Sequence, residues 1–381
     1  MSGRFKKYVI EIETKGPLHV GNGEKHSPYE FVYQPESKKL GMLNEGKWLK
    51  YLKDNRLYEK YEKDALKNNF KVFTWMDENS IDPWSIDVYR YIIEGVEQDK
   101  DKALNDVSCL VKNYCGEPYL PGSGIKGMFR TALLSYKILK ERKNYIEYWN
   151  MLEKSNTREM NKCIRNVEGK CLDVLPKKDE NKNLQSQLLD VFRAILVSDS
   201  CTVSAGNITV VQKTDWGQKT VNSGKTLPLW REALKKNTLL SFAVTMDINM
   251  LKSSRIGITG IEDLLEILDY YYENILLKFD SNFRIQGIDE FYSSKEKPLV
   301  YLGGGTGFHT KSILYSLAPD SNSARKVISR LLDERFNEKH NHVVNDTKVS
   351  PRTIKFAKTQ QGLSRMGLCS MKVVDEIACD D

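Results

Sequence analysis

The pattern that most limits the possible folds is the strict alternation of residues in the segment 239–250, LLSFAVTMDINM. Every even-numbered position from 240 to 250 is apolar. A period of two places these side chains on one side of an extended strand. The segment 7–13, KYVIEIE, alternates in the same way through Tyr8, Ile10 and Ile12. The chain is therefore expected to build a sheet with one buried face.

Helical patterns interrupt these strands. Apolar residues recur at helical spacing in 122–143 and 261–279, and Ser321 is expected to cap a further helix. Residues 46–70 and 84–104 are rich in Lys, Glu and Tyr and predict an inserted helical lobe. Strands interspersed with helices, without regular parallel crossovers, favour an α+β fold over a doubly wound sheet.

Each half of the chain combines an alternating strand with a glycine-rich turn that leads into a helix. This predicts two related α+β units, 1–215 and 238–381, with the helical insertion at about 46–104. The segments 153–187 and 214–228 are polar and are predicted as loops. Further short strands are predicted at 192–200, 208–213, 351–358 and 366–374.

Composition restricts the class of protein. A chain of 381 residues with 40% hydrophobic residues can bury a core, and a net charge of +7 permits binding to nucleic acid. The seven cysteines include no C-x-x-C pair, and no segment reaches the roughly 20 apolar residues of a membrane span. The N-terminus has no apolar signal core. We predict a reduced, cytoplasmic protein without a zinc site.

The segment 119–136, YLPGSGIKGMFRTALLSY, places glycines and cations at the start of an amphipathic helix. Ser123 is expected to cap this helix, and the glycines allow a tight turn before it. The amides of a helix N-terminus attract anions, and Lys126 and Arg130 add full charge one turn apart. This pattern predicts a phosphate site.

A second glycine-rich segment, 301–317, has the sequence YLGGGTGFHTKSILYSL and carries His309 and Lys311. Tight turns alone also explain such glycines, but two of these segments favour an extended polyanion. Neither is a good nucleotide loop. GSGIKG (122–127) lacks the strand and acidic residue of a dinucleotide site, and GTGFHTKS has Thr310 where a phosphate loop needs glycine.

Catalytic groups are scarce. His19 or His26 could serve as the general base of a metal-independent ribonuclease, but the favoured interpretation of both is a loop histidine that is solvated or touches RNA backbone. No aspartate occurs between Thr14 and Lys53, which disfavours metal-dependent cleavage. Asp199 is expected to cap a turn or orient a basic neighbour.

The segment 350–358, SPRTIKFAK, mixes charged and aromatic side chains. Arg352, Lys355 and Lys358 accompany Phe356, a combination that suits single-stranded RNA. An edge strand protected by lysine is the other interpretation of this segment.

Four segments together resemble the RAMP superfamily of CRISPR-associated RNA-binding proteins. They are TKGPLHVGNG (14–23), YLPGSGIKGMFRTAL (119–133), LVSDS (196–200) and LGGGTGFHTKS (302–312). Their order and spacing, with the closing PRTIKFAK, are most similar to the family of fifth subunits of type III-A (Csm) effector complexes. The resemblance spans nearly the whole chain except 46–104 and 153–187.

The resemblance implies an RRM-like, ferredoxin-like RAMP fold and a role in antiviral defence. Its implied partners are the guide RNA (crRNA), the backbone RAMP subunit and the small subunit of the Csm complex, with host nucleases for 3′ trimming and no membrane. Such a subunit caps the 3′-proximal end of the guide RNA and supports its maturation.

The residues that match the family motifs are implied to contact guide RNA. They are Gly122, Ser123, Gly124, Lys126 and Arg130 at the helix, Gly303, Gly304, Gly305, Gly307 and Lys311 at the second loop, and His19 and Asn22 at the first loop. The backbone subunit of the family cuts with an aspartate in its first loop, which this chain lacks. We therefore expect a non-catalytic binder with no metal and no cofactor. The alternative is a metal-independent endoribonuclease that processes precursor guide RNA.

Overall fold

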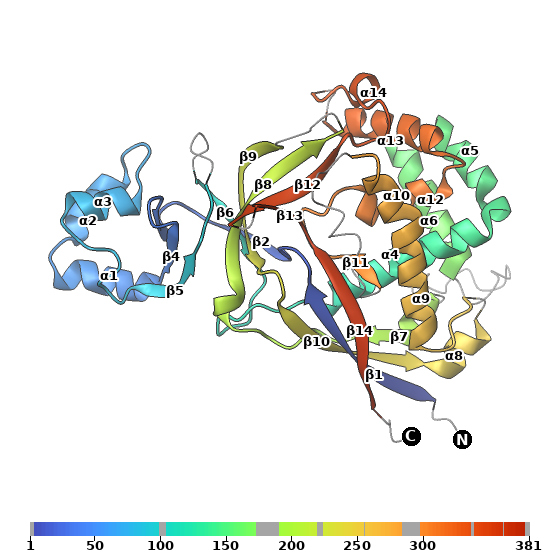
Figure 1. Cartoon of the computed structure of the whole chain (residues 1–381), viewed down its shortest axis with the longest axis horizontal. Helices are drawn as coiled ribbons and strands as arrows, with labels where there is room; N and C mark the ends of the chain where they lie inside the picture. Colours follow the sequence, from blue (N-terminus) through green and yellow to red (C-terminus); the bar gives the residue numbers. More distant parts are fainter. Residues whose placement is uncertain are drawn as a thin grey trace.

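The computed structural model describes residues 4–98, 104–172, 190–218, 224–254, 256–283, 298–336, 339–360 and 362–377. Figure 1 shows a large body of sheets and helices, with a smaller lobe extending from one side. The mixture of helices and antiparallel strands confirms the predicted α+β class.

The first sheet unites the two alternating segments as neighbours. Its strand order is β11–β14–β1–β10–β7, all antiparallel, with bounds Leu299–Tyr301, Leu368–Ile377, Phe5–Thr14, Leu239–Asp247 and Ile195–Val197. In the register, Tyr8 lies opposite Val244 and Ile10 lies opposite Phe242. These side chains are almost completely buried, so the alternation defines the core face of the sheet.

Helices cover this face and share one apolar core with it. They are α4 (Gly122–Lys140), α5 (Ile146–Lys154), α6 (Thr157–Leu172), α8 (Ile248–Ser253), α9 (Ile261–Tyr271), α10 (Leu277–Asp280), α12 (Leu314–Leu317) and α13 (Ser321–Phe336). The short helix α14 (His342–Asn345) packs against α13. A π-helical turn, Tyr272–Leu276, joins α9 to α10 and confirms the continuous helical segment predicted at 261–279. The cap of α13 is Asp320 and not Ser321, because the Asp320 carboxylate accepts the amides of Asn322 and Ser323.

The second sheet has the order β13–β12–β8–β9–β6–β2. Its bounds are Gly362–Arg365, Thr353–Thr359, Ile208–Gly217, Lys225–Leu234, Val107–Leu110 and Gly21–His26. The loop prediction for 214–228 is wrong at both ends, since Thr214 pairs with Thr226 and Asp215 with Lys225 in a long hairpin. Residues 219–223 of that prediction lie outside the described chain. Both body sheets take strands from either side of residue 215, and the division into two related units stays a prediction.

The lobe has its own sheet and its own core. It contains β3 (Phe31–Gln34), β4 (Lys39–Leu43), β5 (Tyr89–Glu94), α1 (Glu45–Asp54), α2 (Tyr58–Ala65) and α3 (Val72–Glu78). Trp48, Leu52 and Trp75 form the centre of its apolar cluster. The predicted helix at 84–104 is wrong over Tyr89–Glu94, where Ile93 is buried between two exposed neighbours, as in a strand.

The predicted loop at 153–187 is also partly wrong. Thr157–Leu172 forms α6, whose buried side chains Met160, Cys163, Val167 and Cys171 follow helical spacing among many polar residues. Residues 173–187 lie outside the described chain. Within the described segments, no helix combines the length and apolar character needed to cross a membrane.

Candidate nucleic-acid interface

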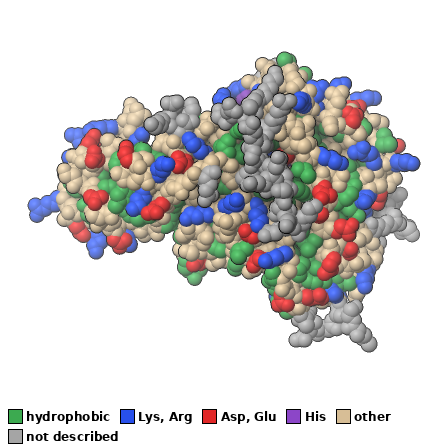
Figure 2. Space-filling model, viewed as in Figure 1, with side chains coloured by type: hydrophobic (Ala, Val, Ile, Leu, Met, Phe, Trp, Pro, Cys, Tyr) green, Lys and Arg blue, Asp and Glu red, His purple; other side chains and the backbone are tan. Residues whose placement is uncertain are grey.

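Surface charge alone does not locate a binding site. On the face drawn in Figure 2, Lys and Arg side chains are spread over both the lobe and the body, with Asp and Glu among them. The contacts that hold each predicted residue therefore decide whether it is free to meet a nucleic acid.

The start of α4 is fixed by a contact that the sequence pattern suggested only in part. Pro121 is the N-cap residue, and the Asp199 carboxylate accepts a hydrogen bond of 2.7 Å from the Gly122 amide that begins the helix, which confirms the predicted capping role of Asp199. Ser123 lies inside the helix, so its predicted capping role is wrong. A Cβ on Gly122 would lie 2.6 Å from the Ser198 carbonyl oxygen, so packing requires glycine here.

The next glycines of α4 have no such packing reason. Ser123, Gly124 and Gly127 are exposed, and a Cβ added to either glycine would meet nothing within 4 Å. Glycine inside a helix is less favourable than alanine by about 1 kcal/mol. A smooth surface that lets another molecule approach the helix backbone closely accounts for these two positions.

The two cations of α4 differ in how far they are neutralised. Arg130 forms an ion pair with Asp190 and lies 3.6 Å from Glu168. Lys126 is half-buried beside the Phe192 ring, and burial lowers the pKa of its ammonium group. Among the described side chains, none forms a hydrogen bond or ion pair with Lys126. Lys126 is therefore the more available cation for an anion.

The first loop and the second glycine-rich loop meet directly. The Gly304 amide donates a hydrogen bond of 2.6 Å to the His19 carbonyl oxygen. Gly303 has a positive φ, and a Cβ there would overlap the same carbonyl. The His19 ring is buried and its Nδ1 lies 2.7 Å from the Glu232 carbonyl oxygen. Burial lowers the pKa of His19, which keeps the imidazole neutral.

Arg231 on β9 adds a cation that the sequence did not reveal. Its Nη1 lies against Gly305, another position with positive φ, so closely that a Cβ on Gly305 would overlap the guanidinium. Burial lowers the pKa of the Lys311 ammonium, and the positive charge of the nearby Arg231 lowers it further. Among the described residues neither cation forms an ion pair, although the carboxylate of Asp215 is close enough to oppose the lowering of the Arg231 pKa by burial. Two adjacent cations without an ion-pair partner, beside half-buried glycine backbone, are an arrangement that can hold an anion.

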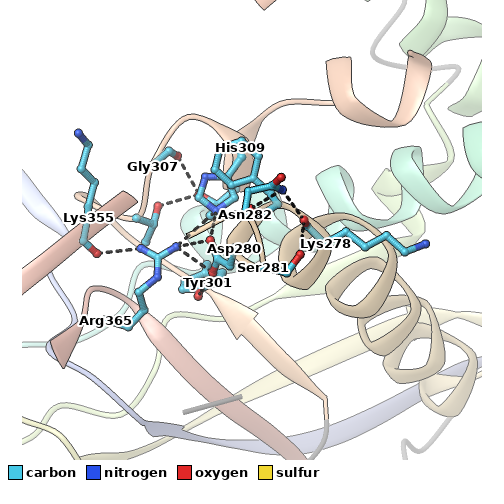
Figure 3. A network of polar contacts seen from close by, with 12 residues as sticks. Lys278, Asp280, Ser281, Asn282, Tyr301, Gly307, His309, Lys355 and Arg365 are labelled. Carbon is cyan, nitrogen blue, oxygen red and sulfur yellow. Dashed lines mark hydrogen bonds and ion pairs between the residues drawn. The ribbon is translucent and has the colours of Figure 1, made fainter. Parts of the chain in front are cut away.

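The end of this loop is held by a buried network (Figure 3). Arg365 donates two hydrogen bonds to Asp280 at 2.8 and 2.9 Å, and the Tyr301 hydroxyl donates to the same carboxylate at 2.8 Å. His309 Nε2 lies 3.3 Å from Asp280, and its ring stacks on Phe279.

The charges in this network follow from its burial. Burial alone would raise the pKa of Asp280, but Arg365 and His309 hold that pKa well below its usual range. Burial lowers the pKa of His309. His309 is thus a neutral core residue that anchors the loop, and its predicted role as a basic contact is wrong.

The segment 350–358 does not form the predicted surface. Phe356 is fully buried and packs beside Trp216, so it cannot stack on a base. Arg352 pairs with Asp346, and Lys355 pairs with Asp215 at 3.0 Å. The edge-strand interpretation is also wrong, since β12 lies between β13 and β8.

The other residues of the first loop lie apart from the glycine backbone. Asn22 is exposed on β2 and its amide donates to Glu24 at 2.7 Å. Burial on its own lowers the pKa of His26, but contacts with Cys109 and Glu232 outweigh burial and raise it to about 10. A histidine with that pKa is protonated at neutral pH and cannot accept a proton as a general base.

Comparisons with known proteins place this geometry in a family. Residues 11–333 match the model of the RAMP superfamily. A CRISPR system protein named Csm5 from Streptococcus thermophilus is 30% identical over 329 residues, which cover 82% of each chain. Csm5 of Mycobacterium tuberculosis (strain ATCC 25618 / H37Rv) is 25% identical over 400 residues, covering 98% of this chain and 99% of the relative.

Two solved structures share the fold. A chain in a cryo-EM structure of a Csm–crRNA–target RNA ternary complex from a type III-A CRISPR-Cas system has a TM-score of 0.71 at 19% identity, covering 96% of this chain and 100% of that one. The crystal structure of T. onnurineus Csm5 has a TM-score of 0.62 at 17% identity, covering 94% and 99%. The chain therefore belongs to the RAMP superfamily and, within it, to the Csm5 family of type III-A CRISPR systems.

Proposed function

We propose that this protein is a non-catalytic RNA-binding subunit of a type III-A CRISPR effector complex, where it caps the 3′-proximal end of the guide RNA. Membership of the Csm5 family supports the place in the complex. The observation that carries the RNA contact is the pair of adjacent cations Arg231 and Lys311, which form no ion pair among the described residues and lie beside the glycine backbone at 303–305. The backbone and small subunits of the complex are the proposed protein partners.

The chemistry of this site suits phosphate more than bases. Its donors are two cations and a glycine-rich main chain, while the neighbouring aromatic side chains Phe279 and Tyr301 are buried. Phosphate contacts position a nucleic acid without reading its sequence. A subunit that must accept guide RNAs of differing spacer sequence needs contacts of this kind.

The start of α4 supplies a second contact surface in the proposal. Gly124 and Gly127 let the RNA backbone approach the helix, and Lys126 provides charge next to them. Arg130 contributes less, because Asp190 and Glu168 already neutralise it. Asn22 is proposed as an exposed polar contact at the edge of the first loop.

We propose that the protein is not catalytic because of the protonation and hydrogen bonding of the two candidate histidines. His19 is held neutral with its Nδ1 bonded to a main-chain carbonyl, and His26 is protonated beside Glu232. Neither stands as a free general base with an acid partner aimed at the same site. Maturation of the 3′ end is then the work of a separate host nuclease.

The test is RNA binding as a function of salt, with the full-length chain and a labelled guide RNA. For single strands, each phosphate contact contributes about −0.7 to the log–log slope of affinity against salt. We expect Arg231→Gln and Lys311→Gln each to flatten this slope by about 0.7. Arg90→Gln is the matched control, since Arg90 is an exposed arginine of the lobe. Unchanged slopes for both site variants would contradict the proposed contact.

The same samples test for cleavage. The RNA is expected to stay intact with Mg²⁺ and with EDTA. Discrete products that persist in EDTA and disappear in His19→Ala or His26→Ala would replace the capping role by the endoribonuclease alternative.

A further inference from the structure

A second polar cluster lies where the lobe meets the body, away from the glycine loops. Its centre is Glu232 on β9, which is fully buried. The Glu232 carboxylate accepts hydrogen bonds from Lys112 at 2.6 Å, from the Leu110 amide at 2.8 Å and from the Tyr91 hydroxyl. Tyr91 belongs to β5 of the lobe, so the cluster links the lobe sheet to the body sheet (Figure 1).

Three potential metal ligands converge in this cluster. The ligand atoms of His26, Cys109 and Glu232 all lie within 4.8 Å of one another. They come from β2, β6 and β9, which are neighbours in the second sheet, so the backbone ladder fixes their spacing. An imidazole, a thiol and a carboxylate are the donor types that bind Zn²⁺.

The distance between two of the ligand atoms agrees with a small metal site. His26 Nε2 is 3.6 Å from Glu232 Oε1. Two ligands bound tetrahedrally at zinc distances stand about 3.3–3.8 Å apart. The Cys109 thiol donates a weak hydrogen bond of 3.9 Å to the Val107 carbonyl oxygen, and its other polar contact is with His26, a member of the same cluster. It can therefore turn toward a metal without losing a strong hydrogen bond outside the cluster.

His26 is oriented as a metal ligand would be. Its Nε2 atom is buried and has no hydrogen-bond partner among the described atoms. Its other nitrogen, Nδ1, lies 3.4 Å from Glu30 Oε1. A carboxylate behind the imidazole is the usual outer partner of a metal-binding histidine, because it fixes the ring orientation and strengthens the donor. Lys112 and the Leu110 amide similarly fix the other oxygen of Glu232.

We propose that His26, Cys109 and Glu232 bind one divalent zinc ion, which links the edge strand β2 to β6 and β9 at the base of the lobe. Binding displaces the proton of the Cys109 thiol and any proton on His26, which pass to solvent, while Glu232 coordinates as the carboxylate. The expectation of no zinc site came from the missing C-x-x-C pair. Residues 26, 109 and 232 are too far apart in the sequence to form such a motif.

The main rival is that His26 simply stays protonated and pairs with Glu232 without a metal. The two differ in an observable way, because only a metal site forms a bond from Cys109. The probe is Co²⁺ added to untagged full-length protein that has been stripped with EDTA and dialysed. A thiolate–cobalt charge-transfer band that saturates at one equivalent and is abolished by one equivalent of Zn²⁺ is expected.

Matched variants assign the ligands. Cys109→Ser is expected to abolish the band, whereas Cys115→Ser, at an exposed cysteine, should retain it. Glu30→Gln is expected to weaken Co²⁺ binding about 10- to 100-fold through the loss of its hold on His26, and Glu24→Gln should not. Circular dichroism on each stripped variant checks that it is folded.

Metal binding by the wild-type protein is enough to overturn the proposal, so the test does not depend on whether each variant folds. Zinc uptake well below one equivalent, or saturation without a charge-transfer band, would show that the cluster is an ordinary ion pair. A band of equal strength in Cys109→Ser would place the metal elsewhere. The readout does not involve RNA, so its result is independent of the proposed capping function.

Discussion

The two glycine-rich segments look alike in the sequence, yet the structure uses them differently. At the start of α4, Asp199 caps the helix and Arg130 is neutralised, while Gly124 and Gly127 stay open to solvent. At the second loop, Gly303 and Gly305 are pressed against other parts of the chain. One segment is an open surface on a regular helix, and the other is a tightly held loop.

The two segments also differ in how their cations are paired. On α4, Arg130 is balanced by Glu168 of α6 and by Asp190, whereas Arg231 and Lys311 form no ion pair among the described residues. The second loop instead keeps its balanced charges in the buried network of Asp280 and Arg365. A glycine motif alone therefore does not show that a loop binds an anion, because cations that are already paired with carboxylates are not available to the anion.

The largest expected difference concerns two arginine–aspartate pairs. Arg365→Met should lower the free energy of unfolding by about 3–5 kcal/mol, because it leaves Asp280 charged and buried. Arg130→Met should change it by less than about 1 kcal/mol, since its pair with Asp190 is partly exposed. Urea unfolding of both variants measures the contrast. Equal losses would show that the two segments are anchored alike.

Replacing a glycine by alanine should change the free energy of unfolding with opposite sign in the two segments. Gly303→Ala places a Cβ against the His19 carbonyl at a positive φ and should destabilise the protein by about 1–3 kcal/mol. Gly124→Ala enters open space in a helix and should stabilise the protein by about 0.5–1 kcal/mol. Thermal unfolding checks both. If Gly124→Ala also leaves RNA affinity unchanged, the helix backbone is not a contact surface.

The salt dependence of RNA affinity should respond differently to the loss of Arg231 and to the loss of Arg130. Arg231→Gln is expected to flatten the salt dependence by about 0.7, the value for one phosphate contact. Arg130→Gln should flatten it less, because Arg130 must first give up Asp190 and Glu168 to meet a phosphate. The measurement is affinity for one guide RNA over a salt series. A larger effect at Arg130 would reverse the assignment of the main anion site.

The sequence predicted those elements whose pattern is local. The alternation at Tyr8 to Ile12 and at Leu240 to Met246 records burial on one face, and both segments are central strands. Only the end of the second segment was misjudged, since Ile248 and Met250 belong to α8. The strand at 89–94 was missed because Lys and Glu around it suggested a solvated helix, although Ile93 and its exposed neighbours alternate.

The site was less predictable because tertiary contacts assemble it. Arg231 stands in a strand with no motif, and only the packing of β9 against the glycine loop brings it to Gly305. His309 stands inside a glycine-rich motif, yet its ring is buried on Phe279. Sequence spacing could indicate which loops carry charge, but not which charges are already paired.

The smallest expected effect is a pH dependence of stability that belongs to the second loop. Burial lowers the pKa of His309 in the folded state, whereas an unfolded histidine titrates near pH 6.5. At this residue the unfolded chain therefore binds a proton that the folded chain does not, so the contribution of His309 to the free energy of unfolding should fall as the pH drops from 7.5 toward 5.5.

His19 contributes with the same sign, because burial lowers its pKa too, whereas His26 contributes with the opposite sign, because its pKa is raised to about 10. His309→Gln should reduce the steepness of this fall, while His340→Gln, at an exposed position of the chain, should leave it unchanged. The readout is the difference between urea midpoints at the two pH values, which is insensitive to a uniform loss of stability in the variant. An unaltered pH slope in His309→Gln would mean that the buried imidazole keeps its proton between Asp280 and Phe279, and the anchor of the second loop would then be an ion triad instead of a neutral ring.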